Sequence, residues 1–113
     1  AADLYVLHSK ESELASDQLR NLSIAYRNIG TIALSIPDGK TAVKYLERAD
    51  TVLPLDRWDA FARKAEAYRL IGDADRCKDY AQQAMDATDK FDEPKRSNAR
   101  ARVQAILDAL ASP

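Results

Sequence analysis

The sequence predicts an all-α fold of about five helices, arranged as antiparallel helix pairs in an α-α solenoid. Three observations support this prediction. Apolar residues recur at helical spacing along most of the chain. The segment from Ile36 to Ala49 aligns with the segment from Ile71 to Ala84 at an offset of 35 residues, with Ile, Asp, Tyr and Ala at matching places. Such a period is typical of stacked helix-turn-helix units. The chain has only 3 glycines and 4 prolines, too few for a turn-rich β protein.

The composition is that of one ordinary globular domain. Among 113 residues, 46% are hydrophobic and 31% are charged. The 17 basic and 18 acidic residues give a formal net charge of −1. This balance predicts no nucleic-acid partner and no electrostatic attachment to a membrane. No apolar run approaches the roughly 20 residues that a membrane-spanning helix needs.

The single cysteine, Cys77, excludes an intrachain disulfide and leaves the redox compartment open. The chain begins Ala-Ala-Asp rather than with Met. We therefore expect it to be a processed form or a domain of a longer protein.

The first helix is expected over about residues 11–35. It follows a short apolar cluster formed by Leu4, Val6 and Leu7. This cluster fits a helix of a preceding unit, a segment that crosses the end of the solenoid, or an ordered N-terminal tail. Within the predicted helix, apolar residues are spaced by three or four positions, which places them on one face. They are Ala15, Leu19, Leu22, Tyr26, Ile29 and Ala33.

The second helix is expected over about residues 40–52. Pro37, in the sequence Ser-Ile-Pro-Asp-Gly, ends the first helix, because proline lacks an N–H and pushes the residue before it out of the helical region. Pro54 follows the end of the second helix. The inward residues of the second helix are predicted to be Ala42, Tyr45, Leu46, Ala49 and Val52.

The third helix is expected to end at Leu70, with Asp56 as its N-cap. Gly72 and Asp73 form the second turn, and a fourth helix extends to about Thr88. The inward residues of the third helix are predicted to be Trp58, Phe61, Ala65 and Tyr68, and those of the fourth Tyr80, Ala81, Ala84 and Met85.

The fifth helix is expected over about residues 94–110, with Pro94 in its first turn. Its apolar stripe consists of Ala99, Val103, Ile106, Leu107 and Leu110. No segment of the sequence has the pattern of a strand.

The spacing of these residues resembles the tetratricopeptide repeat (TPR) family. In that family, helix A carries an aromatic, a leucine, a glycine and a second aromatic, and helix B carries an alanine, a large apolar residue four positions later and a closing proline. In the first unit (23–56), the helix A positions are occupied by Tyr26, Ile29, Gly30 and Ala33, and the helix B positions by Ala42, Leu46 and Pro54. The second unit (57–91) matches at Phe61, Ala65, Tyr68, Cys77, Ala81 and Ala84.

The second unit departs from the pattern at two positions. Lys64 replaces the leucine, and Asp89 stands where the proline is expected. We expect Lys64 to bury its aliphatic stem and keep its ammonium group in water. The resemblance implies that residues 1–22 are an N-terminal extension leading into the first helix and that residues 93–111 are a C-terminal capping helix.

The resemblance also implies where a partner would bind. In the TPR family the concave surface is built mainly from helix A residues that do not pack inward. Carried onto this chain, these residues are Ile24, Arg27, Asn28, Thr31, Leu34, Asp59, Ala62, Arg63, Glu66 and Arg69. Some family members bind the acidic C-terminal tails of chaperones. Asp59 and Glu66 would repel such a tail, so we do not expect this chain to be an adaptor of that kind.

The sequence lacks the residues that a catalytic site or a metal site requires. His8 is the only histidine, so a histidine-based triad or a two-histidine metal site has no second member. The carboxylates between Asp86 and Glu93 lack the ligand spacing of a calcium loop. The basic residues of 95–102 have no interleaved aromatics. We expect no enzymatic activity, no cofactor and no metal.

The sequence therefore predicts a non-enzymatic protein-interaction module that binds a peptide or a partner domain. Two alternatives stay open. One is self-association as a homodimer, through Leu4, Val6 and Leu7 or through the stripe from Val103 to Leu110. The other is a regulatory segment of a larger protein.

Overall fold

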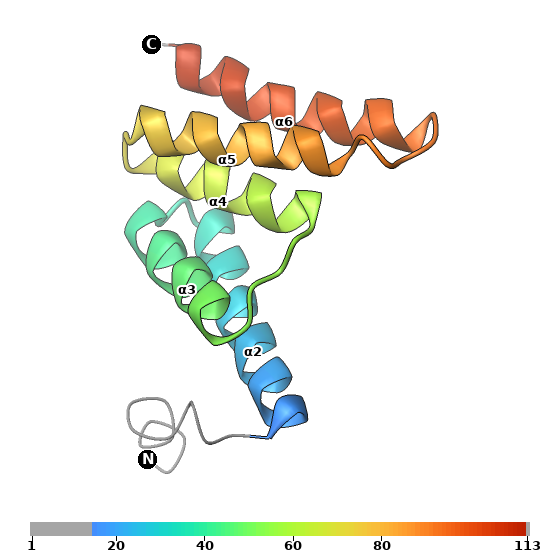
Figure 1. The fold of residues 1–113 in the computed structure, drawn as a ribbon. Helices are drawn as coiled ribbons and strands as arrows, with labels where there is room; N and C mark the ends of the chain where they lie inside the picture. Colours follow the sequence, from blue (N-terminus) through green and yellow to red (C-terminus); the bar gives the residue numbers. More distant parts are fainter. Residues whose placement is uncertain (1–14, 113) are drawn as a thin grey trace.

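The computed structural model describes residues 15–112, which form five helices and contain no strand. The first helix, α2 (Ser16–Ser35), is followed by α3 (Gly39–Val52), and the two lie antiparallel (Figure 1). A second antiparallel pair is formed by α4 (Trp58–Leu70) and α5 (Ala74–Ala87). The last helix, α6 (Lys95–Ala111), packs against α5 and α4. The predicted all-α class is thereby confirmed for these residues.

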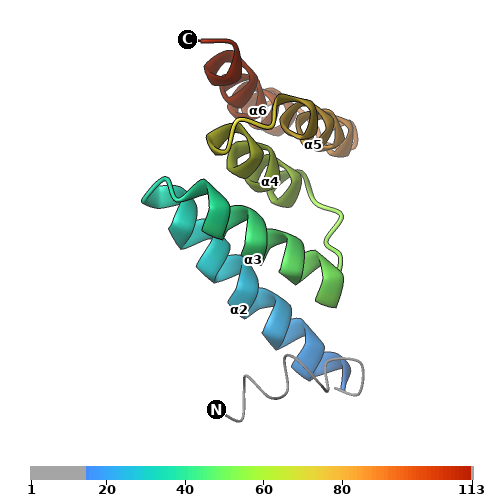
Figure 2. The same cartoon turned by 90° about the vertical axis from the view of Figure 1, so that its left-hand side faces the viewer.

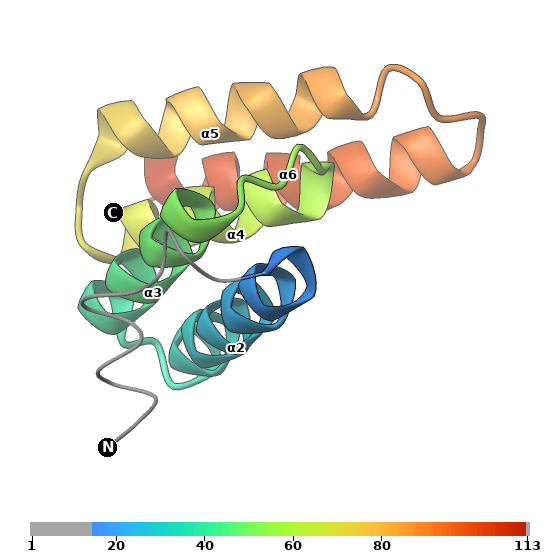
Figure 3. The ribbon, with the colours of Figure 1, turned by 60° about the horizontal axis from the view of Figure 1, so that its bottom comes forward.

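The five helices are stacked in chain order. In Figure 2, α2, α3, α4 and the α5–α6 layer follow one another from one end of the molecule to the other. The two pairs meet mainly where α3 packs on α4. Viewed from the α2 end, α6 lies partly behind α4 (Figure 3), and it contacts both α4 and α5.

Both tight turns between paired helices are capped by an aspartate. Asp38 precedes α3 and Asp73 precedes α5, and their φ and ψ angles agree within a degree (−88° and 84° against −89° and 83°). Each carboxylate accepts a hydrogen bond from the backbone N–H three residues later, at Thr41 and Arg76. This N-cap satisfies one of the free N–H groups at a helix start. Gly72, at φ 80°, provides the left-handed residue of the second turn.

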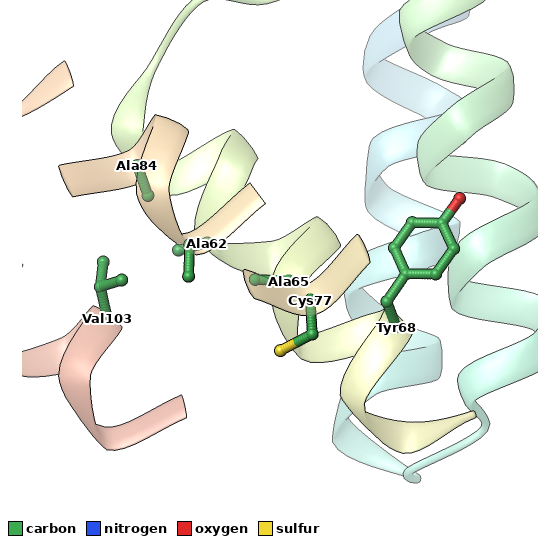
Figure 4. Packing of buried hydrophobic residues seen from close by; sticks show 7 residues of the cluster. Ala62, Ala65, Tyr68, Cys77, Ala84 and Val103 are labelled. Carbon is green, nitrogen blue, oxygen red and sulfur yellow. The ribbon is translucent and has the colours of Figure 1, made fainter. Parts of the chain in front are cut away.

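The core is made mostly of small residues. Figure 4 shows Ala62 and Ala65 of α4, Cys77 and Ala84 of α5 and Val103 of α6 packed together; Ala65, Cys77, Ala84 and Val103 are fully buried. Small side chains allow the helix axes to approach within about 8–10 Å. The fifth helix therefore uses its apolar stripe within the monomer, because Ile106, Leu107 and Leu110 pack against the same cluster.

Three sequence expectations about helix faces and caps need correction. Ala15 and Ile29 were predicted to face inward, but Ala15 is exposed at the N-cap of α2 and Ile29 is 41% exposed. Tyr26 and Ala33 are buried as predicted, together with Ser23 and Gly30. Gly30 lies where α2 packs closely on α3. A Cβ at position 30 would lie only 2.7 Å from the Leu46 side chain, so the buried face of α2 carries its smallest residue there. Asp56 does not cap α4; the N-cap is Arg57, which provides no side-chain hydrogen bond to the helix.

Lys64 is not a snorkelling residue. It is 7% exposed, and its ammonium group forms ion pairs with Asp50 and, at 3.0 Å, with Glu47. Its Nζ also lies 4.1 Å from the centroid of the Tyr80 ring. The ammonium group is therefore held between α3, α4 and α5 rather than in water.

Candidate functional site: a groove between three helices

A groove of about 450 Å³ lies between α2, α4 and α6. We call it the α2–α4–α6 groove. Thr31 and Leu34 of α2 form one wall, and Arg102 and Ile106 of α6 contribute the other. The part formed by α4 consists of Trp58, Asp59, Ala62, Arg63 and Glu66.

Helical spacing explains why these α4 residues share one surface. Asp59, Ala62, Arg63 and Glu66 follow one another at intervals of three, one and three residues, which keeps them on one side of the helix. The opposite side of α4 carries Ala65 and Tyr68 into the core. The pattern of α4 thus accounts for the part of the groove that this helix contributes, whereas the walls come from α2 and α6.

The two carboxylates of the groove have arginine partners. Asp59 Oδ2 accepts a hydrogen bond from Arg57 at 3.0 Å and lies 3.7 Å from Arg63. Glu66 accepts two hydrogen bonds from Arg69, one of them at 3.0 Å from Nε. The paired Glu66 carboxylate raises the pKa of the Arg69 guanidinium, so the guanidinium stays charged. The second oxygen, Asp59 Oδ1, is buried and has no hydrogen-bond partner among the described residues.

The cation of α6 that contacts Trp58 is arranged differently. Arg102 lies over the Trp58 ring, with 5.3 Å between its guanidinium carbon and the ring centroid. No carboxylate of the described residues forms an ion pair with it. Guanidinium groups favour aromatic faces, and the contact leaves the edge of the guanidinium available to a ligand.

Trp58 and Arg102 also border a second depression of about 360 Å³, which we call the α4–α6 hollow. Its other residues are Pro94, Lys95, Asn98 and Ala99. Lys95 Nζ lies 4.2 Å from the centroid of the Phe91 ring, again without a carboxylate partner within residues 15–112. The groove and the hollow therefore adjoin at the Trp58–Arg102 pair.

The sequence-based site residues separate into three groups. Thr31, Leu34, Asp59, Ala62, Arg63 and Glu66 line the groove, and Arg69 is attached to it through Glu66. Ala62 was predicted to face away from the core, but it is 8% exposed and belongs to the core cluster as well. Ile24 and Asn28 are exposed on earlier turns of α2. Arg27 is turned toward α3, where it forms an ion pair with Asp50 at 2.6 Å and donates to the backbone oxygen of Leu53 at 2.8 Å.

Three groove residues were not predicted, namely Trp58, Arg102 and Ile106. Trp58 was predicted to face inward with Phe61, Ala65 and Tyr68, and it does pack against the core cluster while also bordering the groove. Arg102 and Ile106 belong to α6, and their place beside α4 depends on how α6 docks. The one available signal was that Arg102 lies outside the apolar stripe of its helix.

A further depression of about 430 Å³ lies elsewhere, and its lining consists of Asp56, Phe61, Gln83, Asp86, Ala87, Asp89 and Lys90. Two of its three carboxylates have local partners, because Asp89 pairs with Arg100 and Asp86 accepts a hydrogen bond from Gln82 at 2.9 Å. The described residues contain no group of three or more His, Cys, Asp or Glu side chains able to hold a metal ion. Within the same residues, no helix is both long enough and apolar enough to cross a membrane.

Cys77 is fully buried between α4 and α5. Burial, together with the nearby Glu66 carboxylate, raises the pKa of its thiol. A buried, protonated thiol is a poor nucleophile, so Cys77 acts as a packing residue.

Comparison of the chain with family models, with curated proteins and with solved structures found no match.

Proposed function

We propose that the chain is a protein-interaction module that binds an extended segment of a partner in the α2–α4–α6 groove and has no catalytic role. The observation that carries this proposal is the groove itself, formed by residues of three helices and containing both apolar and charged side chains. A concave surface with apolar walls and a few fixed polar groups is the usual form of a ligand site. Because regular helices supply the walls, little order has to be gained on binding.

We also propose that the two helix pairs are repeats of the tetratricopeptide type, followed by a capping helix. The matching geometry of the Asp38 and Asp73 turns, 35 residues apart, supports this. In a short array of this kind, the side chains of the first helix of each unit and of the capping helix border one groove. The repeat then acts as the scaffold, and recognition depends on the residues that differ between the units.

The experiment that tests the binding proposal selects peptides from a random display library on the immobilised domain. Affinities of enriched peptides are then measured by titration of the fluorescence of Trp58, the only tryptophan. Thr31→Tyr places a larger side chain at an exposed position of the groove wall, and we expect it to weaken binding by about tenfold or more. The matched control is Gln83→Tyr, an exposed position on α5 that borders a different depression.

The proposal is wrong if no peptide is enriched, or if Thr31→Tyr and Gln83→Tyr bind the enriched peptides equally well. Thermal unfolding of both variants, followed by circular dichroism, establishes that any loss of binding is not a loss of folding.

A second candidate function is self-association. Of the surfaces expected from the sequence, Leu4, Val6 and Leu7 lie outside the described residues, and the stripe from Val103 to Leu110 packs against the core of the molecule. Exposed isoleucines at the end of α2 offer another surface: Ile29 and Ile32, on one side of the helix, are 41% and 63% exposed, and Ile36, at its C-cap, is 66% exposed. Adjacent exposed apolar side chains of this kind mark contact surfaces more often than isolated ones. Light scattering on wild type and Ile32→Asp tests this candidate: a dimer that the substitution dissociates supports it, and a monomeric wild type at high concentration overturns it.

A further inference from the structure

We infer that the partner segment is acidic, and that it places carboxylate side chains on Arg102 and Lys95 next to an apolar residue held in the α2–α4–α6 groove. This inference rests on the proposed function and specifies the chemistry of the ligand. It follows from which charges at the site are already neutralised and which are not.

The acidic residues of the site do not face the ligand as free charges. Asp59 forms ion pairs with Arg57 and Arg63, and Glu66 forms an ion pair with Arg69. Each carboxylate thus has an intramolecular cation, and the repulsion that these two residues would exert on an acidic ligand is largely cancelled.

The cations of α6 have no such partners. Arg102 lies over the face of Trp58 and Lys95 over the face of Phe91, and neither forms an ion pair within residues 15–112. A cation on an aromatic face keeps its hydrogen-bond donors available, and a carboxylate satisfies the guanidinium fork with two parallel bonds. The chain as a whole has a formal charge of −1, so this local excess of cations is a property of the site.

The spacing of the two cations predicts the spacing of the acidic residues. Arg102 follows Lys95 by seven residues of one helix, which corresponds to about 10 Å along its axis. A segment in the polyproline II conformation rises about 3.1 Å per residue and returns to the same side every three residues, about 9 Å. Two carboxylates three positions apart therefore match the Lys95–Arg102 pair.

An apolar neighbour fits on the groove side of Trp58. Leu34, Ala62 and Ile106 provide apolar lining there, while the carboxylates lie over the α4–α6 hollow. The segment would thus cross the Trp58–Arg102 pair, with its apolar residue on one side and its acidic residues on the other.

The test uses synthetic peptides of eight residues, acetylated and C-terminally amidated, so that side chains are the only carboxylates. Each contains one leucine, two prolines and two glutamates separated by one, two, three or four positions, and each has an isosteric partner with glutamine in place of glutamate. Binding is followed by the fluorescence and the indole N–H signal of Trp58. The variants are Arg102→Gln and, as a control, Lys78→Gln at an exposed position of α5.

We expect the glutamate peptide with the three-position spacing to bind wild type about tenfold more tightly than its glutamine partner at low salt. We expect Arg102→Gln to reduce this preference to about threefold or less, and Lys78→Gln to preserve it. The inference is overturned if glutamate and glutamine peptides bind wild type equally, or if Arg102→Gln keeps the full preference.

The outcomes separate this inference from the proposed function. If glutamine peptides bind as well as glutamate peptides and Thr31→Tyr weakens both, the groove binds peptides but not through carboxylates. If no peptide binds and Thr31→Tyr is without effect on any library-selected ligand, the proposed function itself fails. If single-stranded oligothymidine binds at Trp58 more tightly than the acidic peptides, the cations serve a nucleic acid and the inference is wrong.

Discussion

At the scale of single residues, the ion pairs of Lys64 connect the two helix pairs. Its ammonium group reaches Asp50 and Glu47 of α3 from its position on α4. Asp50 also pairs with Arg27 of α2, and Glu47 accepts a hydrogen bond from Tyr68 at 3.0 Å. Burial disfavours the charge on Lys64, but the hydrogen bonds to Asp50, Glu47 and Tyr80 outweigh this effect and raise its pKa. Lys64 is therefore charged throughout the neutral range.

Replacing Lys64 with methionine should destabilise the protein. Lys64→Met keeps the length of the side chain but leaves Glu47 and Asp50 without their shared cation. Removing one member of a buried ion pair costs about 3–5 kcal/mol, and the partial exposure of these two carboxylates reduces the expected loss to about 2 kcal/mol. Urea unfolding measures the change.

A matched control and a rescue accompany this prediction. Lys78→Met, on the exposed face of α5, should change the free energy of unfolding by less than about 0.5 kcal/mol. Adding Glu47→Gln to Lys64→Met should recover part of the loss, because glutamine still accepts the tyrosine hydrogen bonds without a charge. An unchanged stability of Lys64→Met would contradict the role assigned to the ion pairs.

Tyr68 makes the stability depend on alkaline pH. Burial, followed by the hydrogen bond to the Glu47 carboxylate, raises the pKa of Tyr68 to about 12 from 10.0. Because the folded pKa is above the unfolded value, this contribution is complete below pH 10.0 and is lost as the pH rises toward about 12. The raised pKa of Lys64 acts in the same direction above pH 10.5.

We expect the free energy of unfolding to fall between pH 10 and about 12, and Tyr68→Phe to make this fall less steep. Urea titrations at several pH values give the slope for both proteins. If the slope of Tyr68→Phe equals that of wild type, the phenol is not held protonated by the folded structure.

The contacts of individual side chains were the hardest feature to predict from the sequence. The pattern showed correctly that Thr31, Asp59, Arg63 and Glu66 lie outside the core of their helices. It did not reveal that Arg27 pairs with α3, because an ion pair 23 residues apart leaves no local signal. The ion pairs of Lys64 were missed for the same reason, because its partners lie 14 and 17 positions earlier in the chain.

At the scale of helices, the boundaries were predicted well wherever a turn residue specifies them. The residues from Ile36 to Asp38 separate α2 from α3, and Asp73 lies in the turn before α5, as the sequence indicated. The start of α4 was missed because Asp56, although a favourable cap, lies one residue outside the N-cap position taken by Arg57. Local propensity fixes a helix end only to within a residue or two.

Gly39 shows how closely the helix pairs approach. It is the first residue of α3, and a Cβ added to it would lie 2.7 Å from Leu70 Cβ and 2.9 Å from Ile71 Cγ2. Alanine normally favours a helix over glycine by about 1 kcal/mol. Here the overlap with α4 outweighs this gain, so we expect Gly39→Ala to destabilise the protein by about 1–2 kcal/mol.

The control is Lys40→Ala, at the next, exposed position of α3, where we expect a change within about 0.5 kcal/mol. Thermal unfolding followed by circular dichroism ranks the two variants. A Gly39→Ala protein that is more stable than wild type would show that the ends of α3 and α4 are not in tight contact.

At the scale of the whole molecule, the class and the order of the helices were predictable, whereas their docking was not. Periodicity identified the five helices, since each buries one face. The position of α6 beside α4 creates the groove wall of Arg102 and Ile106, and it depends on the shapes of Val103 and the alanines it packs against. Such complementarity between small side chains has no signature in a hydrophobic pattern.

The contacts between the helix pairs predict how the molecule unfolds. Ala67 of α4 is buried together with Ala33, Ala42 and Leu46, so the core of the first pair is completed by the second. The Lys64 ion pairs cross the same boundary. Because neither pair buries its apolar surface alone, the described helices should unfold in one cooperative transition.

Two probes test this cooperativity. Far-ultraviolet circular dichroism reports on all helices, and the fluorescence of Trp58 reports on α4 and α6. We expect the two urea transitions of wild type to coincide, because the Ala67 and Lys64 contacts couple the pairs. In Lys64→Met the coupling is weaker, and the circular dichroism transition should begin at lower urea than the Trp58 transition, as α2 and α3 separate first. Two distinct transitions already in wild type would show that the helix pairs are independent, and the stacked arrangement would then contribute little to stability.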